Sequence, residues 1–194
     1  MNFDKIIQKR KSVKSFEIKK VKFEKILDAI DAANQGPFAG NQNNLKYIIV
    51  EDQKTLRRIS KEAHQTWISN AQAAIVITSN DVNLENMYGE RGRIYSRQQA
   101  GAAIMTLIFK LVDNGLSTCW VGAYTDELIR NILKIPGHMQ VEAILPIAYE
   151  KKTKLKESKK RKKELENTIF WEEWDNKKRP TITKEPPVRA EQKR

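Results

Sequence analysis

Four side chains near the N-terminus could together bind an anion. Arg10, Lys11 and Lys14 supply positive charge within the segment RKSVK, and Ser12 adds a hydroxyl group and backbone donors. Arginine suits phosphate oxygens because it can donate two parallel N–H groups. A solvated basic helix end explains the same pattern and is favoured by the pattern alone. The segment is therefore consistent with either a phosphate clamp or an ordinary charged surface.

A polar stretch, GPFAGNQNN at residues 36–44, raises a second possibility. It lies between a predicted amphipathic helix at 21–34 and a predicted buried strand at 47–50, and most such connections are much shorter. Glycine permits close approach of the backbone to a ligand, and asparagine offers side-chain amides. We expect either a loose connector or a loop arranged to hold something.

The common signatures of hydrolytic and nucleotide-binding enzymes are missing from the chain. It has no G-x-S-x-G, H-E-x-x-H, C-x-x-C or G-x-x-x-x-G-K-[ST] motif, and no G-x-G-x-x-G follows a predicted strand. His64 and His138 stand in unrelated contexts, so no metal site is expected. Without a nucleophile and base pair, any catalysis is expected to depend on a cofactor.

The net charge of +12 is concentrated near the C-terminus. Residues 1–150 hold 20 basic and 16 acidic residues, a net +4, whereas residues 151–194 hold 16 basic and 8 acidic residues, a net +8. Segment 151–163, KKTKLKESKKRKK, attracts phosphate-bearing partners without specificity. A basic module that binds nucleic acid or an anionic surface through 151–163 is therefore an alternative function, although the mildly basic bulk of the chain makes a nucleic-acid partner the weaker expectation.

Length and hydropathy indicate one globular domain outside the membrane. The 194 residues are 40% hydrophobic, enough to bury one core, and no run of about 18 apolar residues predicts a membrane span. The N-terminus lacks the apolar region of a secretion signal. Cys119 is the single cysteine, which fits a reducing compartment, so a cytoplasmic protein is expected.

Helices and short apolar strands alternate along the chain. Hydrophobic periodicity predicts helices at 3–10, 21–34, 52–68, 98–115 and 125–137. Buried strands are predicted at 47–50, 73–78, 118–122 and 141–149. The polar region 80–97 is predicted to be a surface excursion. This order favours an α/β or α+β layer with a sheet covered on both faces.

Five segments in this order resemble the FMN-dependent nitroreductase family: RKSVK, GPFAGNQNN, QQAGAAI, NGLSTCWVG and IPG…VEAILPIAY. The resemblance covers about residues 3–150 and continues weakly through KKRKKELENTIFWEEW. It implies an α+β fold, a three-layer sandwich with a central, mainly antiparallel sheet flanked by helices. It also implies an interlocked homodimer. We expect one FMN-binding domain at 1–176, including the basic segment, and an extended or loosely ordered tail at 177–194.

The activity implied by the resemblance is flavin-dependent reduction. NADH or NADPH would reduce bound FMN, and the flavin would reduce a small-molecule acceptor such as a nitro-aromatic compound or a quinone. No catalytic side chain is expected, because hydride transfer takes place at flavin N5. Other flavin chemistry on the same fold, such as dehalogenation, is a further alternative.

The resemblance also implies which residues contact FMN. Arg10, Lys11 and Ser12 match the clamp on the phosphate and ribityl chain, with Lys14 near the polar edge of the flavin. The loop that reaches the flavin from the other subunit matches Pro37, Phe38, Ala39, Gly40 and Asn41. The segment beside the isoalloxazine ring matches Trp120, Val121 and Gly122. Arg161 is the expected distal phosphate ligand, in competition with Lys159, Lys160 and Lys162.

The sequence departs from the family pattern at several positions. Phe38 stands where a small serine is usual, and Asn43-Asn44-Leu45 replaces the usual Gln-Pro-Trp. Gln99 stands where an aspartate is common before the long helix, and Ala148 replaces a frequent glycine. The first two changes could alter the pocket above the flavin face, and hence the acceptor.

Overall fold

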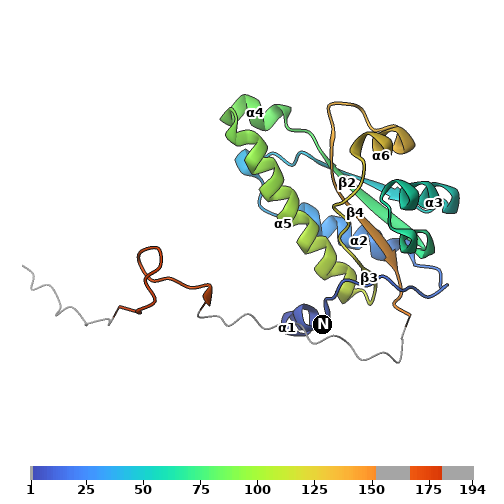
Figure 1. Ribbon diagram of the computed structural model, residues 1–194, viewed down its shortest axis with the longest axis horizontal. Coiled ribbons are helices and arrows are strands. Elements are labelled where there is room, and N and C mark those ends of the chain that lie inside the picture. Colours follow the sequence, from blue (N-terminus) through green and yellow to red (C-terminus); the bar gives the residue numbers. More distant parts are fainter. Residues whose placement is uncertain (1, 152–166, 181–194) are drawn as a thin grey trace, which may run out of the picture. The chain divides into compact units, whose positions relative to one another are not determined.

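A computed structural model of the chain describes residues 2–151 and 167–180 (Figure 1). The chain divides into two compact units, Met1–Lys152 and Thr153–Arg194. The predicted division into a domain at 1–176 and a tail at 177–194 stays a prediction.

The first unit is organised around a four-stranded sheet with the order β1-β2-β4-β3. The strands are β1 (Leu45–Val50), β2 (Ala73–Ser79), β3 (Ser117–Thr118) and β4 (Gln140–Ala148), and every pair of neighbours is antiparallel. All seven residues of β2 are buried, as are seven of the nine in β4. This burial on both faces explains why the two central strands read as continuous apolar runs.

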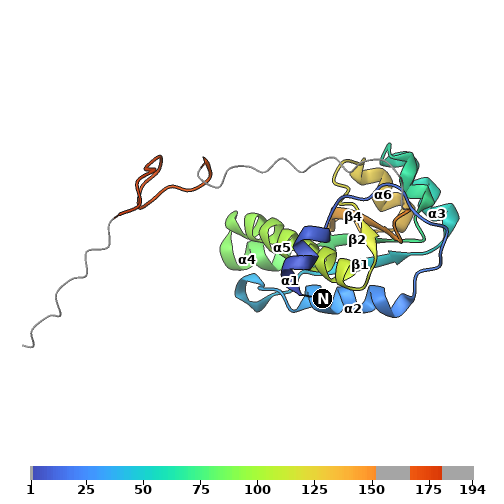
Figure 2. The ribbon, with the colours of Figure 1, turned by 90° about the horizontal axis from the view of Figure 1, so that it is seen from below.

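Helices cover both faces of the sheet, as Figure 2 shows for α3 and α6 on one side and α2 on the other. One hydrophobic cluster joins the sheet to α2 (Phe23–Asn34) and α5 (Arg91–Asp113). A second cluster joins the opposite face to α3 (Gln53–Glu62) and α6 (Asp126–Leu133). The short α1 (Phe3–Lys9) packs on α5, where Phe3 meets Phe109 edge to face at 5.6 Å. The predicted α+β three-layer fold is confirmed.

The stretch 80–97, predicted to be a surface excursion, is largely exposed, but most of it is helical. It forms α4 (Val82–Tyr88) and the first two turns of α5. The two helices touch at Gly92, where an added Cβ would lie 2.3 Å from the backbone carbonyl carbon of Leu84. The polar side chains that suggested an excursion are used in contacts between these helices and the sheet.

Two other predicted elements are shorter than expected. The helix predicted at 52–68 ends at Glu62, and His64 has a positive φ of 51° before the 3-10 turn η2 (Thr66–Asn70). The strand predicted at 118–122 is reduced to β3, which lies at the edge of the sheet. Val121 makes only an isolated bridge with Ile144.

The described part of the second unit is a short irregular segment with ring contacts. Phe170 packs on Trp174 with ring centroids 4.7 Å apart, and the Lys177 ammonium lies 4.1 Å from the Phe170 centroid. Trp174 is nevertheless 86% exposed. Across residues 2–151 and 167–180, no helix has the length and apolar character needed to span a membrane.

Candidate functional site

The RKSVK segment lies along the β3 edge of the sheet. Val13 donates its backbone N–H to the carbonyl oxygen of Thr118 at 3.0 Å, and Ser12 forms a parallel bridge with Thr118. Val13 is buried, whereas Ser12 and Lys14 on either side of it are exposed. The extended backbone therefore directs the Ser12 and Lys14 side chains away from the core.

Two of the cationic side chains of this segment have partners within the fold. The Lys11 ammonium pairs with the Glu150 carboxylate at 2.9 Å, and the Lys14 ammonium lies 5.5 Å from the centroid of a Trp67 ring. Arg10 follows α1 directly and is half-buried. Three cationic groups thus gather within five residues at one edge of the sheet.

The predicted ring-side segment continues from β3. Trp120 is 39% exposed and Gly122 is exposed, whereas Val121 is buried and exchanges two backbone hydrogen bonds of 3.0 Å with Ile144. This pairing fixes the segment rigidly and leaves the Trp120 indole at the surface. Next to it, the Thr118 hydroxyl is buried and has no hydrogen-bond partner among the described residues.

The loop at 36–44 lies against α4 and α5. Ala39–Asn41 form the 3-10 turn η1, in which both Gly40 and Asn41 have a positive φ of 56°. An added Cβ on Gly40 would lie 2.6 Å from Met87 Cε, so glycine meets both a backbone and a space requirement here. Phe38 is half-buried and packs on the first hydrophobic cluster.

A buried amide holds this loop to α5. Gln99 accepts a hydrogen bond from the Ala39 backbone N–H at 3.0 Å and donates to the Gln42 carbonyl oxygen at 3.1 Å. A shallow hollow of about 220 Å³ adjoins this contact. It is lined by Pro37, Ala39, Tyr95, Gln98, Gln99 and Ala102.

The structure brings the predicted site residues together in two groups, not one. The clamp and the ring-side segment share the β3 edge, near the C-terminal end of α5, whereas the loop lies near α4, toward the other end of that helix (Figure 1). Gln99 contacts the loop, and the Leu111 carbonyl accepts from the Leu116 N–H just before β3. These two positions on α5 are about 18 Å apart at the usual helical rise. Arg161 lies outside the described residues, as do its competitors Lys159, Lys160 and Lys162.

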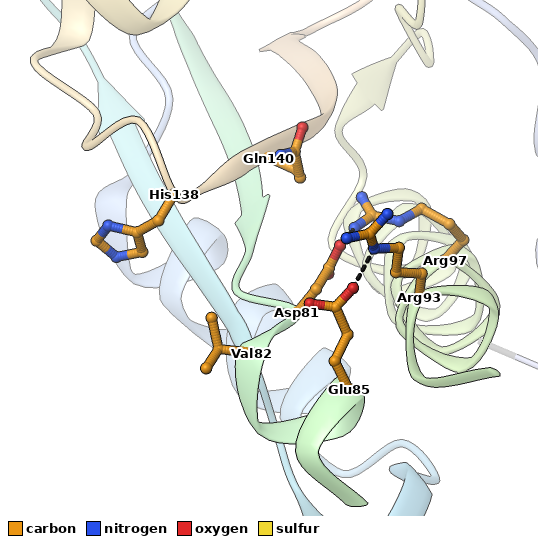
Figure 3. A pocket seen from close by; sticks show the side chains of 7 residues that line it. All are labelled: Asp81, Val82, Glu85, Arg93, Arg97, His138 and Gln140. Carbon is orange, nitrogen blue, oxygen red and sulfur yellow. Dashed lines mark hydrogen bonds and ion pairs between the residues drawn. The ribbon is translucent and has the colours of Figure 1, made fainter. Parts of the chain in front are cut away.

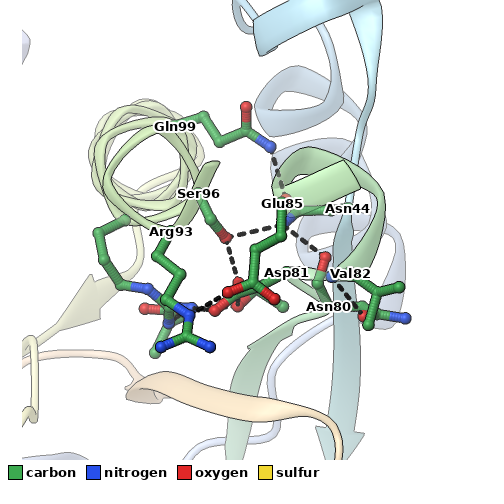
Figure 4. A network of polar contacts seen from close by, with 11 residues as sticks. Asn44, Asn80, Asp81, Val82, Glu85, Arg93, Ser96 and Gln99 are labelled. Carbon is green, nitrogen blue, oxygen red and sulfur yellow. Dashed lines mark hydrogen bonds and ion pairs between the residues drawn. The ribbon is translucent and has the colours of Figure 1, made fainter. Parts of the chain in front are cut away.

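A network of polar side chains links the loop to the sheet (Figure 4). Asn44 accepts from Gln99 Nε2 at 2.5 Å and donates to Ser96 Oγ at 2.7 Å, and Ser96 donates to Asp81 Oδ1 at 2.6 Å. Arg97 then pairs with both Asp81 and Glu142. Sequence reasoning missed this network, because its members are scattered polar residues without a motif.

A larger open pocket of about 550 Å³ lies beside the network (Figure 3). It is lined by Asp81, Val82, Glu85, Arg93, Arg97, His138 and Gln140. Its arginines are engaged by acids, since Arg93 pairs with Glu85 and Arg97 with Asp81. Among the described residues, no group of three or more His, Cys, Asp or Glu side chains could hold a metal ion.

Two half-buried tyrosines are poor acids near neutral pH. Burial raises the pKa of Tyr47 to about 12, and burial, followed by the nearby Asp126 charge, also raises the pKa of Tyr124. Tyr124 donates its hydroxyl to the Val141 carbonyl at 2.8 Å. Both phenols therefore stay protonated.

The fold is that of a three-layer α+β protein, and comparison with known proteins identifies its family. The model of the Nitroreductase family matches residues 7–74 and 61–149, so the chain belongs to this family.

Individual relatives carry different names. An "Iodotyrosine deiodinase" of Thermotoga neapolitana is 25% identical over 163 residues, covering 74% of this chain and 86% of the relative. A "Putative NADH dehydrogenase/NAD(P)H nitroreductase" of Archaeoglobus fulgidus is 26% identical over 155 residues, covering 77% and 86%. The structure of an FMN-dependent nitroreductase from Clostridium difficile R20291 superposes with a TM-score of 0.67 at 24% identity, covering 77% and 88%, and so supports the fold.

Proposed function

We propose that the protein is a homodimeric flavoprotein oxidoreductase of the cytoplasm. It binds FMN and transfers electrons from NADH or NADPH to a small-molecule acceptor such as a nitro-aromatic compound or a quinone. The observation that carries the proposal is the Val13–Thr118 hydrogen bond, which lays a basic segment beside the exposed Trp120 in a member of the Nitroreductase family. The names of the relatives support FMN and a nicotinamide donor.

The residues at the β3 edge fit an FMN phosphate. A phosphomonoester carries between one and two negative charges near neutral pH and offers several strong acceptor oxygens. Arg10 and Lys14 supply the opposite charge, Lys11 adds a cation that is shared with Glu150, and the exposed Ser12 hydroxyl supplies a donor. The buried Thr118 hydroxyl, without a partner among the described residues, adds a polar atom that a bound group could satisfy.

Each group of residues has a distinct role in this proposal. When bound, FMN supplies the redox chemistry by accepting a hydride at N5 and passing electrons on. Arg10 and Ser12 hold the phosphate end, and the rigid segment from Trp120 to Gly122 flanks the ring. Within η1 the Ala39 and Asn41 N–H groups are already bonded inside the chain, so the Gly40 N–H is the backbone donor that would favour negative charge on the reduced cofactor.

A second copy of the chain is needed to complete this site. The clamp and the η1 loop lie near opposite ends of α5 within one chain, as described above. In a homodimer, the loop of one subunit can approach the clamp of its partner. This arrangement also explains why an irregular loop is fixed so firmly at a surface.

Reductive dehalogenation is a second candidate, favoured by the relative named as an iodotyrosine deiodinase. The two candidates share FMN and differ in the acceptor. An assay with a nitro-aromatic compound, a quinone and 3-iodo-L-tyrosine under identical reducing conditions separates them. Nucleic-acid binding through 151–163 is a distinct alternative, which predicts salt-dependent binding that is lost when 151–194 are deleted.

The proposed function is tested first by the absorption spectrum of the purified protein. We expect a yellow protein with oxidised-flavin bands, and we expect apoprotein to quench the fluorescence of added FMN. Anaerobic addition of NADH or NADPH should then bleach the flavin bands. A colourless protein that neither quenches nor retains FMN would contradict the proposal.

A further inference from the structure

We propose that Gln99 is a positioning residue that fixes the η1 loop and thereby sets the affinity of the protein for FMN. The inference rests on the proposed function, because it assumes that this loop contacts the flavin. Gln99 itself is 5% exposed and lies within α5, beneath the η1 loop. It therefore acts through the loop backbone to which it is hydrogen-bonded.

The Gln99 amide holds the two sides of the η1 turn. Its oxygen accepts from the Ala39 N–H at 3.0 Å, at the first residue of the turn, and its nitrogen donates to the Gln42 carbonyl at 3.1 Å, just after the turn ends. Ala39 offers only a donor and Gln42 only an acceptor at these points, so one orientation of the amide satisfies both. A glutamine matches this pattern, whereas an ionised carboxylate lacks the donor.

The conformation that Gln99 holds is one that the loop backbone does not favour. Gly40 and Asn41 both have a φ of 56°, and consecutive left-handed residues are rare outside special turns. The turn has its own hydrogen bonds from Asn41 N–H to Phe38 O and from Gln42 N–H to Ala39 O, both 3.0 Å. The bonds from Gln99 tie this turn to the longest helix of the protein.

Asn44 and Ser96 in turn fix the orientation of the Gln99 side chain. The second Gln99 N–H reaches Asn44 Oδ1 at 2.5 Å, and Asn44 also donates to the Asn80 carbonyl at 2.9 Å, at the end of β2. Ser96 accepts from Asn44 and donates to Asp81, so each hydroxyl and amide has a complementary partner. The network thus ties the loop to both α5 and the sheet.

The position of Gln99 bears on ligand binding and not only on folding. The hollow of about 220 Å³ is lined both by Gln99 and by two loop residues, Pro37 and Ala39, so a shift of the loop changes the shape of this hollow directly. Ala39 to Asn41 are the residues expected to approach the flavin. Loss of the Gln99 hydrogen bonds should therefore weaken FMN binding clearly, with only a small change in the melting temperature.

The test uses Gln99→Met, which removes the two hydrogen bonds to the loop and the one to Asn44 at similar volume, and Gln99→Glu, which retains the acceptor. Gln35→Glu is the matched control, since it adds the same charge at an exposed glutamine that does not line the hollow. Hydrogen–deuterium exchange of residues 36–44 in the flavin-free protein measures loop order. We expect faster exchange in both Gln99 variants than in wild type, and wild-type exchange in Gln35→Glu.

FMN affinity provides the second measurement. We expect Gln99→Met to weaken FMN binding about tenfold, the order expected when buried partners lose their hydrogen bonds. Gln99→Glu should be weak at pH 8 and recover toward wild type as the pH falls to 5. Protonation restores the donor toward Gln42, and burial raises the pKa of such a carboxyl into an accessible range. The nearest charged groups of the network, Asp81 and Arg97, are paired with each other and are common to all variants.

The outcomes separate this inference from the proposed function. If wild-type protein fails to bind FMN, the proposed function and the link to the flavin both fail, whatever the exchange data show. If wild type binds FMN but Gln99→Met binds it equally well, or exchanges no faster in 36–44, the positioning role of Gln99 is overturned. Equal pH-dependent recovery in Gln35→Glu would assign the effect to the added charge instead of to the hydrogen bonds of the Gln99 amide.

Discussion

The backbone N–H of Val13 and the carbonyl oxygen of Thr118 are joined by a 3.0 Å hydrogen bond across the edge of the sheet. This contact joins two segments that are far apart in the sequence and places Ser12 and Lys14 on the exposed side of the same edge. The proposed phosphate site therefore depends on a backbone connection that is independent of any charged side chain. Charge in the segment can be changed without removing the connection.

Arg10→Ala should lower FMN affinity while the fold stays intact. Loss of a charge-assisted hydrogen bond to phosphate is expected to weaken binding about 10- to 100-fold. Fluorescence titration with FMN measures the affinity, and circular dichroism checks the fold. Lys9→Ala, an exposed change on α1 one residue earlier, is the control and should bind FMN nearly as wild type does. Unchanged affinity in Arg10→Ala would remove Arg10 from the clamp.

Two glycines of α5 should respond in opposite ways to alanine. At Gly92 a Cβ would lie 2.3 Å from the Leu84 backbone, so Gly92→Ala must push α4 and α5 apart and should lower the melting temperature by several degrees. At Gly101 a Cβ would meet nothing within 4 Å, and alanine favours the helix by up to about 1 kcal/mol. Thermal unfolding of both variants tests the packing of α4 on α5, and equal melting temperatures would contradict it.

Ile104→Ala should be among the costly single changes in the first unit. Ile104 is 1% exposed in the cluster that joins α5 to the sheet, and such truncations cost about 2–5 kcal/mol in the free energy of unfolding. Ile18→Ala, at a residue that is 98% exposed, should change this free energy by less than about 0.5 kcal/mol. Urea denaturation measures both, and a similar loss in the two variants would be inconsistent with the assigned core.

The capping of α3 should be pH-dependent. Asp52 accepts from the Thr55 hydroxyl at 2.7 Å and from its N–H at 2.9 Å, and these hydrogen bonds hold the pKa of Asp52 below its ordinary value. Because the folded pKa is lowered, the stabilisation is present above the unfolded pKa of about 3.9 and is lost as the pH falls through the folded pKa.

Comparison of wild type with Asp52→Ala between pH 6 and pH 2.5 measures this effect. Wild type should be the more stable protein at pH 6, and the difference should shrink below about pH 4. Asp52→Asn retains a capping acceptor that does not titrate, so its advantage over Asp52→Ala should not vary with pH. A constant gap between wild type and Asp52→Ala would contradict the role of the charged cap.

The fold could be predicted from sequence where local pattern and final environment agree. The apolar runs at 73–78 and 141–149 became the central strands, because strands buried on both faces need apolar residues at every position. The apolar helix predicted at 98–115 is likewise the covered part of α5. The helical start of α5 at Arg91 was missed, because Ser96 and Arg97 are polar for contacts with Asp81 and Glu142 that only the tertiary structure creates.

The site could be predicted in its parts but not in its arrangement. The residue types of RKSVK indicated an anion site, and the composition of GPFAGNQNN indicated an ordered loop. Neither pattern predicts the distance between the RKSVK segment and the GPFAGNQNN loop, because this distance is set by the length of α5. Gln99 was noticed only as a departure from a family pattern, since its function depends on backbone groups of Ala39 and Gln42 that have no sequence signal.

The most direct test of the account is complementation between two defective chains. Arg10→Ala disables the clamp, and Gly40→Val disables the loop through its positive φ and the contact with Met87. The two variants are co-expressed with different tags, and the mixed dimer is isolated. FMN is then supplied at a concentration that saturates wild type and leaves each parent variant largely empty.

If the site is built from the clamp of one chain and the loop of another, the mixed dimer contains one intact site and one with both defects. We therefore expect one FMN per mixed dimer, against two per wild-type dimer and almost none in either parent. A mixed dimer as empty as its parents would show that each site lies within a single chain and would contradict the account.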